Sequence, residues 1–173
     1  MKRLLVICLA LLLAACGRAS QSGGTPIPTV DASGLTVSSF KGTVSGAVTG
    51  DFSGIGSYFK QEEGGLLISL VGSQGPSGAS ITIILPAGTV AGTYTPKSYS
   101  DAYDSAANKI TGIGASFSVP NKSSGTDVYA TISDGTLILQ SVDPMTGSIQ
   151  FKAALDGGGE VSVQATFYQL TPV

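Results

Sequence analysis

Apolar and polar residues alternate with a period of two along most of the chain after residue 35. In residues 161–167, two valines, an alanine and a phenylalanine are separated by serine, glutamine and threonine, and residues 149–155 repeat the arrangement. This alternation is typical of half-buried antiparallel strands. Since no stretch carries the 3.6-residue stripe of an amphipathic helix, the chain predicts an all-β domain.

The pattern predicts about nine or ten strands. Residues 40–52 place an apolar side chain at every fourth position with glycines between them, which indicates one bent or closely approached strand. The other strands are expected at residues 55–60, 66–71, 80–85, 92–95, 110–119, 128–133, 136–142, 149–155 and 161–167. A single antiparallel β-sandwich or a closed barrel would bury this many alternating strands, and the pattern leaves both open.

Turn residues between the strands favour a meander of hairpins. Asp134-Gly135 predicts a two-residue hairpin loop. The segment from Asp143-Pro144 to Gly147 predicts a type I turn closed by a glycine in the left-handed region. The aspartate and three glycines of residues 156–159 predict the next reversal.

The N-terminus has a different pattern. Lys2 and Arg3 precede an apolar run over residues 4–12, which leads into Leu13-Ala14-Ala15-Cys16. A helix over residues 4–15 would be about 18 Å long, too short for a bilayer core of about 30 Å, so the segment is expected to be a processed targeting signal. The motif resembles the signal of bacterial lipoproteins. That resemblance implies cleavage before Cys16 and attachment of a diacylglyceryl group to its sulfur.

The resemblance also implies a location and a domain organisation. Residues 1–15 would be removed, and residues 16–34, rich in Gly, Ser, Thr and Pro, would form a flexible tether from the lipidated Cys16. Residues 35–173 would form the single all-β domain. Gly17 stands where an aspartate retains Gram-negative lipoproteins at the inner membrane, so the cell envelope, and the outer membrane in a Gram-negative organism, is the expected location.

Composition excludes several kinds of chemistry. The chain has nine Lys and Arg residues against eleven Asp and Glu; without Lys2 and Arg3 the net charge is about −4. Nucleic-acid binding is disfavoured because it relies on clustered basic residues. The chain has no histidine, and its two cysteines, Cys8 and Cys16, lie in the signal and at the lipidation position. Histidine-dependent catalysis and the usual zinc sites are therefore excluded, and we expect no enzymatic activity, metal or cofactor.

The turn-rich hairpins carry a second resemblance. The stretches around residues 135–151 and 103–117, with their Asp-Pro and Asn-Lys turns, resemble uncharacterised small β-domain envelope lipoproteins. This resemblance implies a fold and a location and says nothing of an activity.

The segment 94–108 is the longest irregular stretch of the predicted domain, and it is the candidate binding loop. It holds five residues of interest: Tyr94, Tyr99, Asp101, Tyr103 and Asp104. Tyrosines at such positions stack on sugars or contact proteins, but they also cap sheet edges. Two carboxylates with nearby carbonyls are a possible Ca²⁺ site, although Ca²⁺ takes six to eight oxygens.

Three function classes remain open. The first is a non-enzymatic binding or structural module, anchored to the membrane by its lipid, for an envelope protein or a glycan. The alternative is a lipocalin-like carrier of a small apolar ligand, and an enzyme is the third. A continuous interior cavity would favour the carrier, whereas a barrel filled by Ile, Val, Leu and Phe would disfavour it.

Overall fold

The computed structural model describes residues 27–62, 64–76, 78–120 and 127–173. These residues form strands and one short helix, so the predicted all-β class is confirmed. The predicted signal and Cys16 lie outside the described residues. The strands are β1 (Ser39–Gly46), β2 (Gly50–Lys60), β3 (Leu66–Gln74), β4 (Ser80–Leu85), β5 (Gly92–Tyr94), β6 (Lys97–Ser98), β7 (Tyr103–Asp104), β8 (Lys109–Ile110), β9 (Gly114–Pro120), β10 (Asp127–Val142), β11 (Met145–Leu155) and β12 (Glu160–Pro172).

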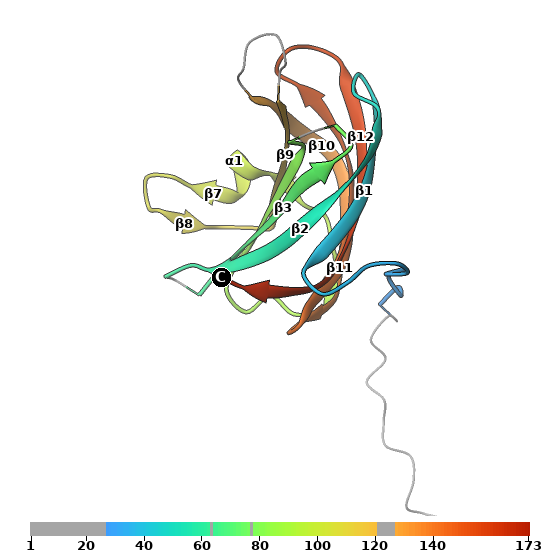
Figure 1. The fold of residues 1–173 in the computed structure, drawn as a ribbon. Coiled ribbons are helices and arrows are strands. Elements are labelled where there is room, and N and C mark those ends of the chain that lie inside the picture. The colour runs from blue at the N-terminus through green and yellow to red at the C-terminus, as the bar shows by residue number, and fades with distance from the viewer. Residues whose placement is uncertain (1–26, 63, 77, 121–126) are drawn as a thin grey trace, which may run out of the picture.

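Eight of these strands form a closed antiparallel barrel (Figure 1). β1, β2, β3, β4, β9, β10, β11 and β12 pair in chain order, and β12 closes the barrel by pairing with β1. Of the two predicted architectures the barrel is therefore correct, and its strands form the predicted meander. Closure pairs the backbone of the strands that would otherwise be sheet edges. The remaining strands lie outside the circle, and β7 and β8 form a hairpin of their own beside it.

The alternation along the strands sets which side chains enter the barrel. In β12 the apolar positions 161, 163, 165 and 167 are all buried, and the polar positions between them are exposed or half-buried. β11 shows the same arrangement at Ile149, Phe151 and Ala153. The predicted inward faces of these two strands are confirmed.

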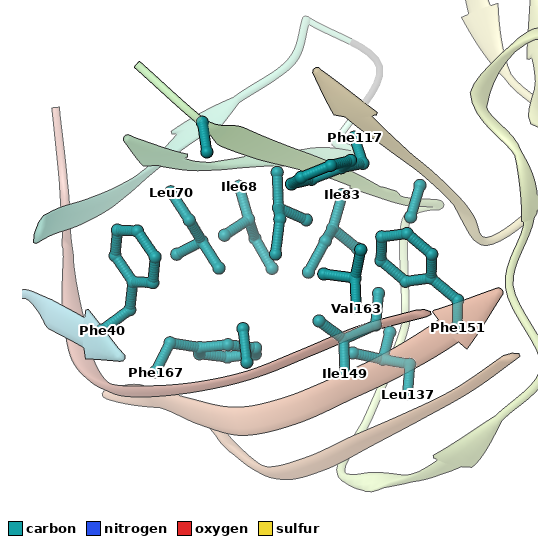
Figure 2. Packing of buried hydrophobic residues seen from close by; sticks show 14 of the residues in the cluster. Phe40, Ile68, Leu70, Ile83, Phe117, Leu137, Ile149, Phe151, Val163 and Phe167 are labelled. Carbon is teal, nitrogen blue, oxygen red and sulfur yellow. The ribbon is translucent and has the colours of Figure 1, made fainter. Parts of the chain in front are cut away.

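Aromatic and aliphatic side chains together fill the interior (Figure 2). The ring centroids of Phe40 and Phe52 are 5.6 Å apart, those of Phe52 and Phe117 are 6.1 Å apart, and those of Phe117 and Phe151 are 6.4 Å apart. These rings come from β1, β2, β9 and β11, so the row crosses the barrel from one wall to another. Ile68, Leu70 and Ile83 pack into the same cluster with no exposed surface.

The prediction of a single strand over residues 40–52 is wrong, although a neighbouring strand does approach closely at Gly42. The chain instead reverses at residues 47–49, between β1 and β2. Gly46 and Gly50 flank the reversal with φ values of 107° and 154°, a region that favours glycine. Alternation did not reveal the turn, because Val48 is half-buried and packs against the core as a strand residue would.

The predicted hairpin at Asp134-Gly135 is also wrong, because both residues lie inside the continuous strand β10. A register shift between Ile132 and Asp134 marks an irregularity in its pairing with β11. A Cβ added to Gly135 would lie 2.8 Å from the Cβ of Phe151. The glycine therefore permits a close approach of two strands and does not make a turn.

The reversal after β10 is shorter than predicted. Only Asp143 and Pro144 connect β10 to β11, and Gly147 lies within β11 and not at a left-handed turn position. A Cβ on Gly147 would lie 2.4 Å from the carbonyl oxygen of Ile138, so close strand packing requires this glycine. The reversal predicted at residues 156–159 is confirmed between β11 and β12.

One helix, α1 (Tyr99–Ala102), departs from the expectation of strands alone. Its four residues are too few to give a periodic stripe in the sequence. No helix within the described residues is long and apolar enough to cross a membrane.

Candidate functional site

The five predicted site residues lie in different surroundings. Tyr94 belongs to β5, pairs with Leu137 of β10, packs against the core and donates its hydroxyl to the carbonyl of Val90 at 2.7 Å. Its position is that of a residue that covers the barrel wall. The other four lie in α1 and β7, in the part of the chain that projects from the barrel (Figure 1).

Tyr99 and Tyr103 form a half-buried pair, with ring centroids 5.5 Å apart and planes inclined by 38°. Burial raises the pKa of the Tyr99 hydroxyl above its usual value, and the neighbouring Tyr103 adds to this effect. Tyr99 is therefore uncharged at neutral pH, and its ring packs beside that of Tyr103.

The two predicted carboxylates do not form a joint site. Asp101 is exposed on α1. Asp104 accepts hydrogen bonds from the backbone N–H groups of Ala106 at 3.0 Å and Ala107 at 3.1 Å, which makes it a turn-forming residue. Across the described residues, no three His, Cys, Asp or Glu side chains gather closely enough to hold a metal ion.

Buried contacts fix this projecting segment to the barrel. The hydroxyl of Ser98 accepts a hydrogen bond from the N–H of Ile132 at 2.9 Å and donates to its carbonyl at 3.1 Å. Ala102 is fully buried, and a Cβ on Gly114 of β9 would lie 2.5 Å from the Cβ of Ala102. α1 and the hairpin after it are thus held in place before any ligand arrives, which lowers the entropic cost of binding.

A hollow of about 580 Å³ lies between this hairpin and the tips of two barrel connections. We call it the loop cleft. A Cβ on Gly65 would lie 2.8 Å from the Cδ1 of Ile110, so this glycine lets β8 approach the barrel closely. The cleft is lined by Gln61, Glu62, Gly65, Pro86, Ala87, Tyr103, Ala107, Asn108, Lys109 and Ile110.

The loop cleft combines one aromatic ring with several polar groups. The Tyr103 hydroxyl donates a hydrogen bond to the Oδ1 of Asn108, and that bond fixes both side chains. Glu62 is an exposed carboxylate at the tip between β2 and β3. An aromatic face beside amide and carboxylate groups can stack on a sugar ring and exchange hydrogen bonds with its hydroxyls.

The sequence pointed to Tyr103 but not to Gln61, Glu62, Asn108 or Lys109. These four residues come from two hairpins that are far apart in the chain, and they share the cleft only because β8 packs against Gly65. No local pattern carries that information.

A second hollow of about 580 Å³, here called the sheet groove, lies on the outer face of the barrel. Lys41 and Thr43 of β1 pair with Thr166 and Gln164 of β12 on one side, and with Ser53 and Asp51 of β2 on the other. The groove is more open and less polar than the loop cleft, and its one aromatic residue, Phe52, is buried.

No protein-family model, curated protein or solved structure matches this chain. The fold alone defines its class, an eight-stranded antiparallel meander barrel with a hairpin attached to its side.

Proposed function

We propose that this protein is a non-enzymatic, lipid-anchored module of the bacterial cell envelope that binds a glycan in the loop cleft. The observation that carries the proposal is the cleft itself, where Tyr103, hydrogen-bonded to Asn108, lines the same hollow as Glu62. The signal-like N-terminus and Cys16 support the anchor, and Gly17 favours the outer membrane in a Gram-negative cell.

A glycan suits the cleft better than a charged polymer does. Its lining offers hydroxyl, amide, carboxylate and ammonium groups in a mixture that carries no dominant charge. The negative net charge of the mature chain also disfavours nucleic acid. The hollow lies within the range of about 300–1,000 Å³ typical of small-ligand sites, so it has room for one or two sugar rings.

The carrier alternative finds less support. The barrel is the architecture that a lipocalin-like carrier requires, but the contacts from Phe52 through Phe117 to Phe151 occupy the interior with protein atoms. An apolar ligand would have to displace these rings. The hollows described above lie on the outside of the barrel, which favours surface binding.

The proposed site predicts that Tyr103→Ala and Asn108→Ala each weaken binding to purified cell-wall glycan by about tenfold or more, a loss typical of residues that dominate binding. Tyr103→Ala removes the stacking surface, and Asn108→Ala removes the amide that orients it. Sedimentation of the lipoprotein with insoluble glycan, measured over a range of protein concentrations, gives the affinities.

Tyr168→Ala is the matched control, because Tyr168 is half-buried on β12 and lies outside the cleft. This variant should bind the glycan as the unchanged protein does. If all three variants bind equally well, the loop cleft is not the glycan site. Thermal unfolding of each variant separates lost binding from lost folding.

The proposed anchor predicts that Cys16→Ser abolishes incorporation of labelled palmitate and moves the protein from the membrane fraction to the soluble fraction. The thioether to diacylglycerol cannot form without the sulfur, so the variant lacks the acyl chains that would hold it stably on a membrane. Cys8→Ser is the control, since it lies in the segment expected to be removed. Equal labelling of both variants would contradict lipidation at Cys16.

A further inference from the structure

Several large apolar side chains lie exposed on one part of the barrel surface. We call them the apolar face: Val37, Ile55, Phe59, Val71 and Val173. Ile55 is 70% exposed and Val71 is 52% exposed. Single exposed apolar residues are ordinary, but a cluster of them marks an interaction surface.

Strand pairing brings these residues together. Ile55 of β2 lies directly opposite Val71 of β3, and four residues further along Phe59 lies opposite Leu67. The carbonyl of Ser38 accepts a hydrogen bond from Gly56, so Val37 stands beside this part of β2. The N–H of Val173 donates to the carbonyl of Tyr58, which places the C-terminus beside the end of β2 (Figure 1).

The segment before β1 lies against the outer side of that strand. Val30 is buried, and the Lys41 ammonium donates a hydrogen bond to the carbonyl of Ser33 at 2.6 Å, so the segment before β1 is held against the barrel. Only eleven Cα–Cα steps separate Cys16 from Ile27, the first described residue. They span at most about 40 Å when extended and about 17–20 Å on average when flexible.

We propose that the apolar face docks on the lipid bilayer to which Cys16 is anchored, an inference that rests on the lipidation proposed above. The short tether keeps the barrel close to the lipid surface, and this high local concentration lets a weak contact persist. Near the face the exposed charges are of both signs, Lys41 and Lys60 on the strands and Glu62 at the hairpin tip. Docking therefore depends on apolar contact, which zwitterionic lipid provides.

The absence of tryptophan from the chain makes a direct test possible. Ile55→Trp introduces a single fluorophore at the apolar face, and Val71→Trp is a second, independent position. Lys152→Trp is the control, because Lys152 is exposed on β11, four strands from β3 around the barrel. Each full-length, lipidated variant is reconstituted into phosphatidylcholine vesicles with and without brominated acyl chains, which quench tryptophan on contact.

We expect the emission of the Ile55→Trp and Val71→Trp variants to shift to the blue and to be quenched several times more strongly than that of the Lys152→Trp variant. Equal quenching at all three positions, with the protein still bound to vesicles, would overturn the docking while leaving the anchor intact. A blue shift that needs no lipid and grows with protein concentration would assign the face to a second copy and overturn membrane docking. Failure of the protein to carry lipid at Cys16 would overturn both proposals.

Discussion

Replacing Phe117 with alanine should lower the free energy of unfolding by about 3–5 kcal/mol, the usual cost of removing a buried phenylalanine. Phe117 has no exposed surface, and its ring lies between those of Phe52 and Phe151. Alanine would lose both ring contacts and leave a void that rigid strand walls close only in part. Urea unfolding of the full-length chain, followed by circular dichroism, measures the change.

Phe59→Ala provides the comparison, because Phe59 lies on the outer face of β2 and is 37% exposed. Its cost should be about 1 kcal/mol or less, as for most surface substitutions.

The same pair of variants tests whether the barrel interior is a ligand site. If an apolar dye binds the unchanged protein and also binds both variants, the interior is accessible, which would contradict the packing of the rings. Binding only after Phe117→Ala would fit a filled barrel.

Local sequence patterns predicted most of the barrel wall. β4 was expected over the residues it occupies, and the inward positions of β11 and β12 followed from simple alternation. These predictions succeeded because one face of each strand contacts the core and the other contacts water, so apolar and polar residues have to alternate along the strand. Closure of the sheet could not be predicted from any single segment, because it depends on the pairing of β12 with β1.

The failures share a physical cause, the double use of glycine. At Gly46 and Gly50 the chain turns, whereas at Gly135 and Gly147 it runs straight past a neighbour that leaves no room for a side chain. A glycine in a turn and a glycine at a close strand contact look the same in the sequence. Only the position of the neighbouring strand distinguishes them. Alternation can likewise continue through a short turn, as Val48 shows.

The candidate site was predicted only in part for a related reason. Tyr103 was predicted because a tyrosine in an irregular segment is a candidate binding residue. Its partner Asn108, and Glu62 on the opposite wall of the cleft, are ordinary turn residues. Their role arises from the packing of one hairpin against another. The apolar face was missed because Ile55 and Val71 fit a strand pattern equally well whether they face inward or outward.

Gly75→Ala tests the role of glycine most sharply, and it should destabilise the protein by at least about 2 kcal/mol. Gly75 has a φ of +92°, which an alanine adopts only at a cost, and its added Cβ would lie 1.8 Å from the carbonyl oxygen of Asp51. The backbone after β3 or at the start of β2 would have to move. Because Gly75 and Asp51 both line the sheet groove, that hollow should also change shape.

Two further glycines separate the contributions of strain and of crowding. Gly88 has a φ of +78° but nothing within 4 Å of an added Cβ, so Gly88→Ala should show only the conformational cost of about 1 kcal/mol. Gly157 lacks both constraints, and Gly157→Ala should be neutral or slightly stabilising because alanine restricts the unfolded chain. Urea unfolding of the three variants should rank Gly75 first, Gly88 second and Gly157 last. Equal losses of unfolding free energy in the Gly75 and Gly88 variants would mean that crowding against Asp51 adds nothing. The close approach of Gly75 to Asp51 would then not be what requires a glycine.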